Sequence, residues 1–291
     1  MRYRWIGVVA LMSAIVAGCS TLQWNLPAVA PAGAERLPGK VVWHDLVTED
    51  PDAAQQFYSA LFGWEFNVVA GLNYWVISHE GQPVGGMVDA REFTRAGNVS
   101  QWVVVISVAN VEGSIEALKA GGGSLMGGPV DVGDRGQLAL VRDEQGAYFA
   151  VLQTRDGDPP DEEIGVGTFM WDELWTSESR AARKLYRTVF GYDARQVVLD
   201  SGEGFSYLAS ENTPRVAVLD MPVPGMAPTW VSYIRVEDVG AMAAEVAQLG
   251  GEVLLPPQEN PVGGELAILK DPAGAGFIIQ TWDRARLEAK P

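Results

Sequence analysis

Hydrophobic positions recur along this chain with two periods, one typical of strands and one typical of helices. Residues 41–47 have the character of a short strand. Asp50 and Pro51 follow and predict a helix start, because proline fits the first helical position, while Gly63 predicts the helix end. The apolar residues between them recur at i, i+3, i+4 and i+7, which is one helix face: Ala54, Phe57, Tyr58 and Leu61.

The segments after this helix have strand character, and the whole order then restarts. Three strand-like segments come first: 65–69, 74–79 and 83–88. A strand at 102–108 and a helix that Asn110 caps open a second round. Three further strands close it: 124–126, 138–142 and 147–153. Each round is therefore one strand, one helix and three strands.

The chain also repeats itself on a larger scale, at an offset of 128 residues. Matching pairs include Trp43/Trp171, Leu46/Leu174, Tyr58/Tyr186, Phe62/Phe190, Gly63/Gly191, Trp102/Trp230 and Asp143/Asp271. So many matches at one offset predict two domains of the same fold, at 40–154 and 164–283. The acidic, proline-rich stretch 155–163 is the predicted linker, and residues 284–291 form a C-terminal tail.

The net charge of the chain argues against one class of partner, the nucleic acids. The 291 residues carry a formal net charge of −16. Binding to nucleic acid requires clustered Lys and Arg against the phosphates, so we expect no nucleic-acid partner. A strongly acidic surface is typical of a well-solvated soluble body.

The N-terminus has the pattern of a bacterial lipoprotein signal. Arg2 and Arg4 precede an apolar run at 5–16, which is too short to span a bilayer. Small residues then lead to Cys19, the one cysteine of the chain, in a stretch that resembles a lipobox. The pattern predicts a signal peptide at 1–18 and, at 19–39, a lipidated Cys19 followed by a tether. Ser20 after the cysteine favours the outer membrane, with the protein anchored by lipid on the periplasmic face.

The order of elements resembles the vicinal oxygen chelate superfamily, the glyoxalase, bleomycin-resistance and extradiol dioxygenase group. Two sequence features carry the resemblance. One is the FY…LFGW segment, which ends at Trp64, and the other is a closing strand after a DxxG turn, at Asp143–Gly146 and again at Asp271–Gly274. The resemblance implies an α+β fold of two tandem glyoxalase-like domains. Each would be built of paired βαβββ units that form a cupped mixed sheet, with the helices on the outside.

The resemblance also identifies where metal ligands would stand. Metal-binding relatives place a ligand on the opening strand, fifteen residues before the tyrosine of the FY pair, and others on the inner and closing strands. Those positions here are Trp43, Val103 and Ala150 in the first domain, and Trp171, Val231 and Ile278 in the second. None of these side chains binds a divalent ion. His44 is one residue off, so strand alternation turns it away from the cup, toward the helix layer. We therefore expect no metal and no other cofactor.

Strand alternation predicts an indole beside a carboxylate in each cup. Trp43 and Asp45 share a face of the opening strand, as do Trp171 and Glu173. A carboxylate against an aromatic wall loses hydration, so its pKa rises. Asp45 and Glu173 are thus the candidate catalytic acid–base groups, and all four residues are candidate ligand contacts. The alternative is that both carboxylates only hold the strand in place. Tyr74 and Tyr148 are further residues whose side chains the first cup could include, whereas strand alternation turns Trp102 and Trp230 toward the helix layer.

Three functions fit these features. The leading hypothesis is a lipid-anchored protein that holds a small organic molecule in a metal-free cup; any catalysis would be that of a metal-independent lyase or isomerase. The second is a metal-dependent lyase or dioxygenase of the same superfamily, with ligands at unusual positions such as His44, Asp45 and Glu173. The third is a structural or partner-binding lipoprotein without catalysis. The two copies could pair within one chain or between chains, so an oligomer stays an alternative.

Overall fold

A computed structural model describes residues 24–91, 98–199, 202, 204–222 and 225–282. The first repeat contains β1 (Val41–Thr48), α2 (Pro51–Phe62), β2 (Glu65–Val68), β3 (Tyr74–His79), β4 (Gln82–Asp89), β5 (Gln101–Ser107), α3 (Val111–Ala120), β6 (Ser124–Asp131), a 3-10 turn (Gly133–Arg135), β7 (Gly136–Arg142) and β8 (Tyr148–Thr154). The second contains β9 (Phe169–Thr176), α4 (Ser179–Phe190), β10 (Asp193–Val198), β11 (Gly204–Ser210), β12 (Thr213–Asp220), β13 (Thr229–Arg235), α5 (Val239–Gln248), β14 (Glu252–Glu259), β15 (Glu265–Lys270) and β16 (Gly276–Gln280). The signal peptide and Cys19 lie outside the described residues.

The helices begin and end where the sequence predicts. Asp50 accepts a hydrogen bond from the amide of Ala53 at the start of α2, and Asn110 accepts one from Gly113 at the start of α3. Gly63 ends α2 with a φ of +70°, a left-handed conformation that glycine adopts without steric cost.

Each repeat forms one eight-stranded mixed sheet. The strand order is β2-β3-β4-β1-β5-β8-β7-β6 in the first sheet and β10-β11-β12-β9-β13-β16-β15-β14 in the second. The central pair is antiparallel, β1 with β5 and β9 with β13, while β1 pairs with β4 and β5 with β8 in parallel. The predicted fold class of two tandem glyoxalase-like domains of paired βαβββ units is confirmed.

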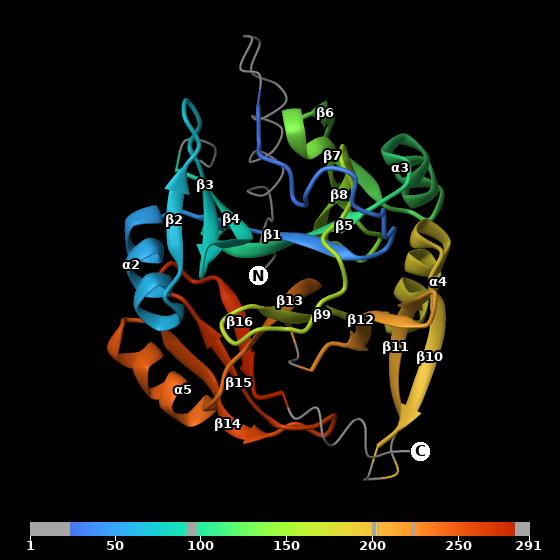
Figure 1. The fold of residues 1–291 in the computed structure, drawn as a ribbon. Coiled ribbons are helices and arrows are strands. Elements are labelled where there is room, and N and C mark those ends of the chain that lie inside the picture. The colour runs from blue at the N-terminus through green and yellow to red at the C-terminus, as the bar shows by residue number, and fades with distance from the viewer. Residues whose placement is uncertain (1–23, 92–97, 200–201, 203, 223–224, 283–291) are drawn as a thin grey trace.

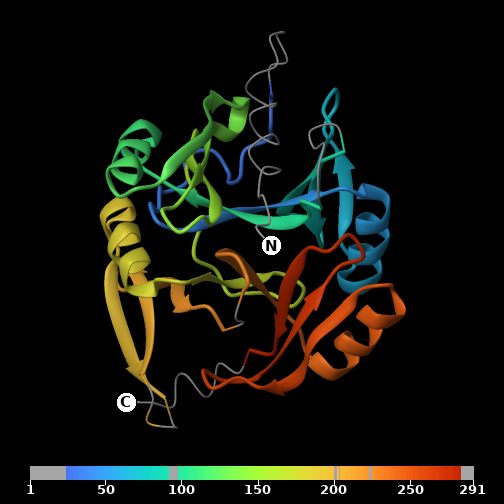
Figure 2. The same ribbon diagram turned by 180° about the vertical axis from the view of Figure 1, so that it is seen from behind.

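The two sheets pack with their convex, helix-bearing faces toward each other. Two buried cores join the domains. One core contains residues of α3 and α4 together with Trp230, and the other contains residues of α2 and α5 together with Trp102. The concave faces therefore open in opposite directions, as Figures 1 and 2 show. We call the concave face of the first sheet cup 1 and that of the second cup 2.

Contacts across this interface follow the repeat. Tyr58 donates a hydrogen bond to Asp271, and its counterpart Tyr186 donates one to Asp143, both at 3.2 Å. The 128-residue offset converts each of these contacts into the other, with the two domains in exchanged roles. The domains are therefore related by an approximate two-fold axis.

His44 lies at that axis and faces its own counterpart. Its Nε2 is 3.0 and 3.1 Å from the two carboxylate oxygens of Asp172, and its ring stacks on Phe169. Ser232 donates a 2.6 Å hydrogen bond to the same carboxylate. His44 therefore points to the helix side, as strand alternation predicts, and it is buried and hydrogen-bonded at the interface.

Residues 24–39 differ from the predicted tether, because they pack on the first domain. Trp24 and Leu26 are only 8% and 4% exposed, against Tyr74, Val88 and Val132 of cup 1. Figure 1 shows this segment, in dark blue, running across the top of the β1–β5 sheet. The reason is hydrophobic: the stretch carries an indole and a leucine that gain more from burial than a solvated linker would allow.

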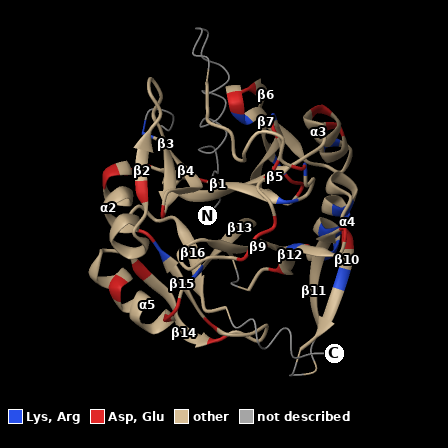
Figure 3. Cartoon of the chain, viewed as in Figure 1, with Lys and Arg blue, Asp and Glu red and all other residues tan. Residues whose placement is uncertain are grey.

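Charged residues are distributed unevenly over the surface. Figure 3 shows acidic residues on many elements and a cluster of basic residues on α4 and β10. Within the described residues, no helix is both long and apolar enough to span a membrane.

We predict that His44→Leu lowers the free energy of unfolding by about 3–5 kcal/mol, because it leaves a buried carboxylate without its nitrogen partner. Asp172→Asn keeps hydrogen-bonding atoms at the axis and should lower it by only about 1 kcal/mol. Urea unfolding followed by circular dichroism measures both. Equal stability of His44→Leu and the wild type would contradict a structural role for the pair.

Candidate functional site

The floor of cup 1 is a buried hydrogen-bond network around Asp45. Asp45 Oδ1 accepts hydrogen bonds from Tyr74 Oη at 2.7 Å and from Trp43 Nε1 at 3.0 Å. β1 supplies Trp43 and Asp45 on one face, because alternate residues of a strand point the same way. Tyr74 comes from β3, two strands away in the sheet. The carboxylate is 6% exposed.

Arg135 completes this network from the 3-10 turn before β7. Its Nη1 donates to Tyr74 Oη at 2.8 Å, and its guanidinium lies over the Trp43 ring, 4.3 Å from the centroid. The side chain is 2% exposed. Burial raises the pKa of Asp45, and the charge of Arg135 opposes that rise.

Cup 2 presents a carboxylate at the equivalent place with different donors. Glu173 Oε2 accepts hydrogen bonds from Trp175 Nε1 at 2.9 Å and from Tyr233 Oη at 2.8 Å. Trp175 lies two residues along β9, and Tyr233 on the neighbouring β13. Burial raises the pKa of Glu173 above its usual value of 4.5, while the hydrogen bonds from Trp175, Tyr233 and Trp171 lower it.

The two cups differ in how far they are covered. Trp43 of cup 1 is buried at 3% exposure, whereas its counterpart Trp171 is only partly buried. The apolar walls of cup 2 are likewise partly buried: Leu219, Met221, Leu255 and Ile268. Cup 2 therefore offers aromatic and aliphatic surface next to Glu173.

The donor set of neither cup fits a metal ion of the kind the fold family implies. The expected ligand positions face the cups but carry apolar side chains: Trp43, Val103 and Ala150 in cup 1, and Trp171, Val231 and Ile278 in cup 2. Each cup has one carboxylate at its floor, already engaged by an indole and a phenol. Among the described residues, no group of three His, Cys, Asp or Glu side chains could hold an ion.

The structure brings together the residue pairs that strand alternation predicts, and it adds others. Trp43 and Asp45 share cup 1, and Trp171 and Glu173 share cup 2. Trp175 was missed, although its position two residues after Glu173 already places it on the same face.

Tyr233 and Arg135 were also missed, and for them the signal is weaker. Tyr233 lies on a different strand from Glu173, and only the pairing register of β9 with β13 brings their faces together. Arg135 lies in a 3-10 turn, and a turn has no sequence periodicity from which the direction of its side chain could be predicted.

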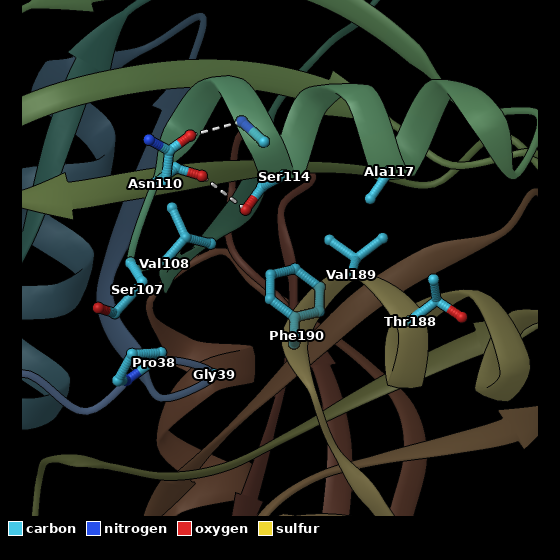
Figure 4. Close-up of a pocket in the computed structure, with 12 residues that line it drawn as sticks. Pro38, Gly39, Ser107, Val108, Asn110, Ser114, Ala117, Thr188, Val189 and Phe190 are labelled. Carbon is cyan, nitrogen blue, oxygen red and sulfur yellow. Dashed lines mark hydrogen bonds between the residues drawn. The ribbon is translucent and has the colours of Figure 1, made fainter.

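Two hollows lie at the seams between the domains, outside the cups. One, of about 300 Å³, lies between α3 and the C-terminal end of α4, beside Pro38 and Gly39 (Figure 4). The other, of about 280 Å³, is its counterpart under the repeat, between α5 and the end of α2. His79 is half-buried there, and its Nδ1 has no hydrogen-bond partner among the described residues. Their recurrence at equivalent places indicates that they arise from helix packing.

Comparison with known proteins agrees with this architecture. The family profile described as the Glyoxalase/Bleomycin resistance protein/Dioxygenase superfamily matches residues 166–279, and one described as Bleomycin resistance protein-like N-terminal matches residues 40–78. Together with the relatives below, these matches show that the chain belongs to the glyoxalase/bleomycin resistance/dioxygenase superfamily.

Two relatives match along nearly their full length. A putative glyoxylase, CFP32, of Mycobacterium tuberculosis is 30% identical over 253 residues, which cover 86% of this chain and 97% of the relative. The anthracycline biosynthesis protein DnrV of Streptomyces peucetius is 30% identical over 259 residues, covering 83% and 93%.

Solved structures share the fold at lower identity. The Mn(II)-bound glyoxalase from Novosphingobium aromaticivorans superposes with a TM-score of 0.58 at 15% identity, covering 84% of this chain and 83% of that one. A catechol 2,3-dioxygenase superposes with a TM-score of 0.56 at 13% identity, covering 85% and 94%. At these identities, the superpositions show the fold alone.

We predict that Glu173→Gln changes how stability depends on pH. A carboxyl group whose pKa is raised in the folded state contributes stability below its unfolded pKa, near 4.5, and loses it as pH rises through the folded pKa. Glutamine has no such loss. The stability of Glu173→Gln relative to the wild type should therefore increase with pH above about 4.5, by at most about 1.4 kcal/mol per pH unit.

Urea unfolding at several pH values between 4 and 8 measures this difference. Glu65→Gln, at an exposed position of β2, reports the effect of losing one surface charge. Parallel curves for Glu173→Gln and the wild type would contradict a raised pKa at Glu173.

Proposed function

We propose that this protein binds a small organic molecule in cup 2 without a metal ion, while a lipid on Cys19 holds it at the periplasmic face of the outer membrane. The observation that carries the proposal is the partly exposed Trp171 beside the buried Glu173 carboxylate. Any chemistry in this cup would use Glu173 as general acid or base, since burial raises its pKa and the carboxyl therefore holds a proton at higher pH than an exposed glutamate does.

The donor chemistry of the cups supports the metal-free part of the proposal. A metal-dependent lyase or dioxygenase needs two or three convergent nitrogen and oxygen ligands with open positions for substrate. Here His44, which the metal hypothesis requires, bonds Asp172 at the domain interface and lies on the opposite face of the sheet from Asp45. The protein named as a Mn(II)-bound glyoxalase is similar in fold, but fold alone does not carry activity.

The chemistry of cup 2 favours a flat molecule with a hydroxyl or amine group. Trp171 offers a ring face, and Glu173 accepts hydrogen bonds from such groups. A relative of this chain is named for anthracycline biosynthesis. The proposed ligand is therefore a hydroxylated aromatic compound.

Lipid attachment would place the two cups differently with respect to the membrane. Four residues, 20–23, separate Cys19 from Trp24, so they span at most about 17 Å even when extended. Trp24 lies in cup 1. The anchor would hold cup 1 toward the bilayer and leave cup 2 open to the periplasm.

We predict that 2-naphthol, a flat hydroxylated probe, binds the full chain after dialysis against EDTA, with metal content checked by mass spectrometry. Glu173→Gln and Trp171→Ala should each weaken binding about ten-fold, because each removes one polar or aromatic contact. Glu65→Gln is the control for loss of charge. Binding that appears only when Mn²⁺ is added, or one ion that copurifies with each chain, would overturn the metal-free proposal.

We predict that Cys19→Ser abolishes incorporation of labelled palmitate in cells and releases the protein from the membrane fraction. The thiol is the atom that would carry lipid, and serine cannot replace it. Even one myristoyl-like chain gives only marginal membrane binding. A protein that carries no lipid should therefore be found in the soluble periplasmic extract. Unchanged labelling in Cys19→Ser would refute anchoring at this residue.

A further inference from the structure

The N-terminal segment 24–29 lies where a ligand of cup 1 would lie. Trp24 packs edge-on against Tyr74, with ring centroids 6.5 Å apart, and Val29 packs with the group that contains Trp43 and Ala150. These are the residues at the floor and wall of the cup. The chain's own segment therefore covers the Asp45 network.

Few polar contacts hold this segment, and they all go to one turn. Leu26 donates its amide to the carbonyl of Val132 at 2.9 Å and accepts the amide of Arg135 at 3.1 Å. Arg135 Nε donates to the carbonyl of Pro27 at 3.1 Å, and Asn25 Oδ1 accepts the amide of Asp134 at 3.3 Å. The segment joins no strand of the sheet. It can leave without breaking the fold of the domain beneath it.

Arg135 carries unused binding capacity under the segment. Its Nε and Nη1 have partners, but its Nη2 is buried and has no hydrogen-bond partner among the described residues. A buried guanidinium nitrogen without an acceptor is costly, and a carboxylate or similar anion is the group that satisfies it in bidentate fashion. The carbonyl of Pro27 supplies only part of what such an anion would supply.

In the part of the chain that the structure describes, cup 2 has neither feature at the equivalent place. The 128-residue offset places Gly263 at the position of Arg135. A guanidinium at the floor therefore distinguishes the two otherwise similar cups. Their ligands should differ in charge: cup 2 has a lone carboxylate, and cup 1 has a carboxylate and an arginine.

We propose that residues 24–29 are a displaceable internal occupant of cup 1, and that the site they cover takes a flat aromatic anion. The ring of this ligand replaces the indole of Trp24 against Tyr74, and its acid group binds Arg135 in place of the Pro27 carbonyl. This site is independent of the ligand proposed for cup 2.

The test uses the full chain with Trp24→Ala and Leu26→Ala together, and 1-naphthoate as the probe. Removing both buried side chains opens the cup, so affinity for 1-naphthoate should rise at least about ten-fold and one further site per chain should appear. The reason is that apparent affinity in the wild type is reduced by the small fraction of open molecules. Pro31→Ala, which changes an exposed position two residues after the segment, is the matched control and should have no effect.

Two further variants assign the site. Arg135→Gln added to the opened protein should remove the gained site, with the circular dichroism spectrum unchanged. Glu173→Gln should weaken 2-naphthol binding but leave the gained 1-naphthoate site intact, so failure of one cup is distinguished from failure of the other. Equal 1-naphthoate affinity in the wild type and a natively folded Trp24→Ala/Leu26→Ala protein would overturn the proposal.

Hydrogen exchange on the wild-type protein tests displacement without any substitution. Saturating 1-naphthoate should speed exchange of the amides of Leu26, Asp134 and Arg135, because displacement of the segment removes the hydrogen-bond acceptor of each. If residues 24–29 exchange no faster than β5 with the probe present, the segment is a permanent part of the fold and the proposal is wrong.

Discussion

The structure depends on the back-to-back packing of two convex sheet faces around one buried contact, His44 with Asp172. The two residues occupy equivalent positions in the repeat, so they meet at the approximate two-fold axis, where each domain presents the same patch. A nitrogen and a carboxylate at this place satisfy each other away from water. Because the convex faces bury each other and the four helices, both concave faces must point outward, in opposite directions.

Duplication preserved the fold but not the chemistry of the cups. Each cup keeps a carboxylate on its opening strand, hydrogen-bonded by indole and phenol donors. The equivalent indoles Trp43 and Trp171 contribute in both cups, whereas the other donors come from non-equivalent places: Tyr74 in cup 1, and Trp175 and Tyr233 in cup 2. In both cups the buried carboxylate is hydrogen-bonded, as a buried charge must be. The cups differ further in what surrounds the carboxylate: an arginine and a covering segment in the first, and partly buried apolar walls in the second.

Desolvation connects the packing to the proposed chemistry. Burial raises the pKa of Glu173, so this carboxyl holds its proton more tightly even though indole and phenol groups donate hydrogen bonds to it. Among the described residues, no group of three His, Cys, Asp or Glu side chains could hold a metal ion. In the proposed function, the apolar walls that bury Glu173 would also supply the surface for a flat ring, so binding and proton exchange would share one physical origin.

Local pattern determined the elements and the directions of their side chains. Periods of two and of about 3.6 located the strands and helices, the 128-residue offset revealed the duplication, and strand alternation turned His44 and Trp102 to the helix side and Trp43 to the cup. The FY…LFGW helix and the DxxG turns likewise predicted the superfamily from the sequence. Only the tertiary structure decided where residues 24–39 lie, and that Arg135 and Tyr233 reach the carboxylates. An irregular segment has no period to interpret, and its place is set by the shape and unmet hydrogen bonds of a surface built from residues far along the chain.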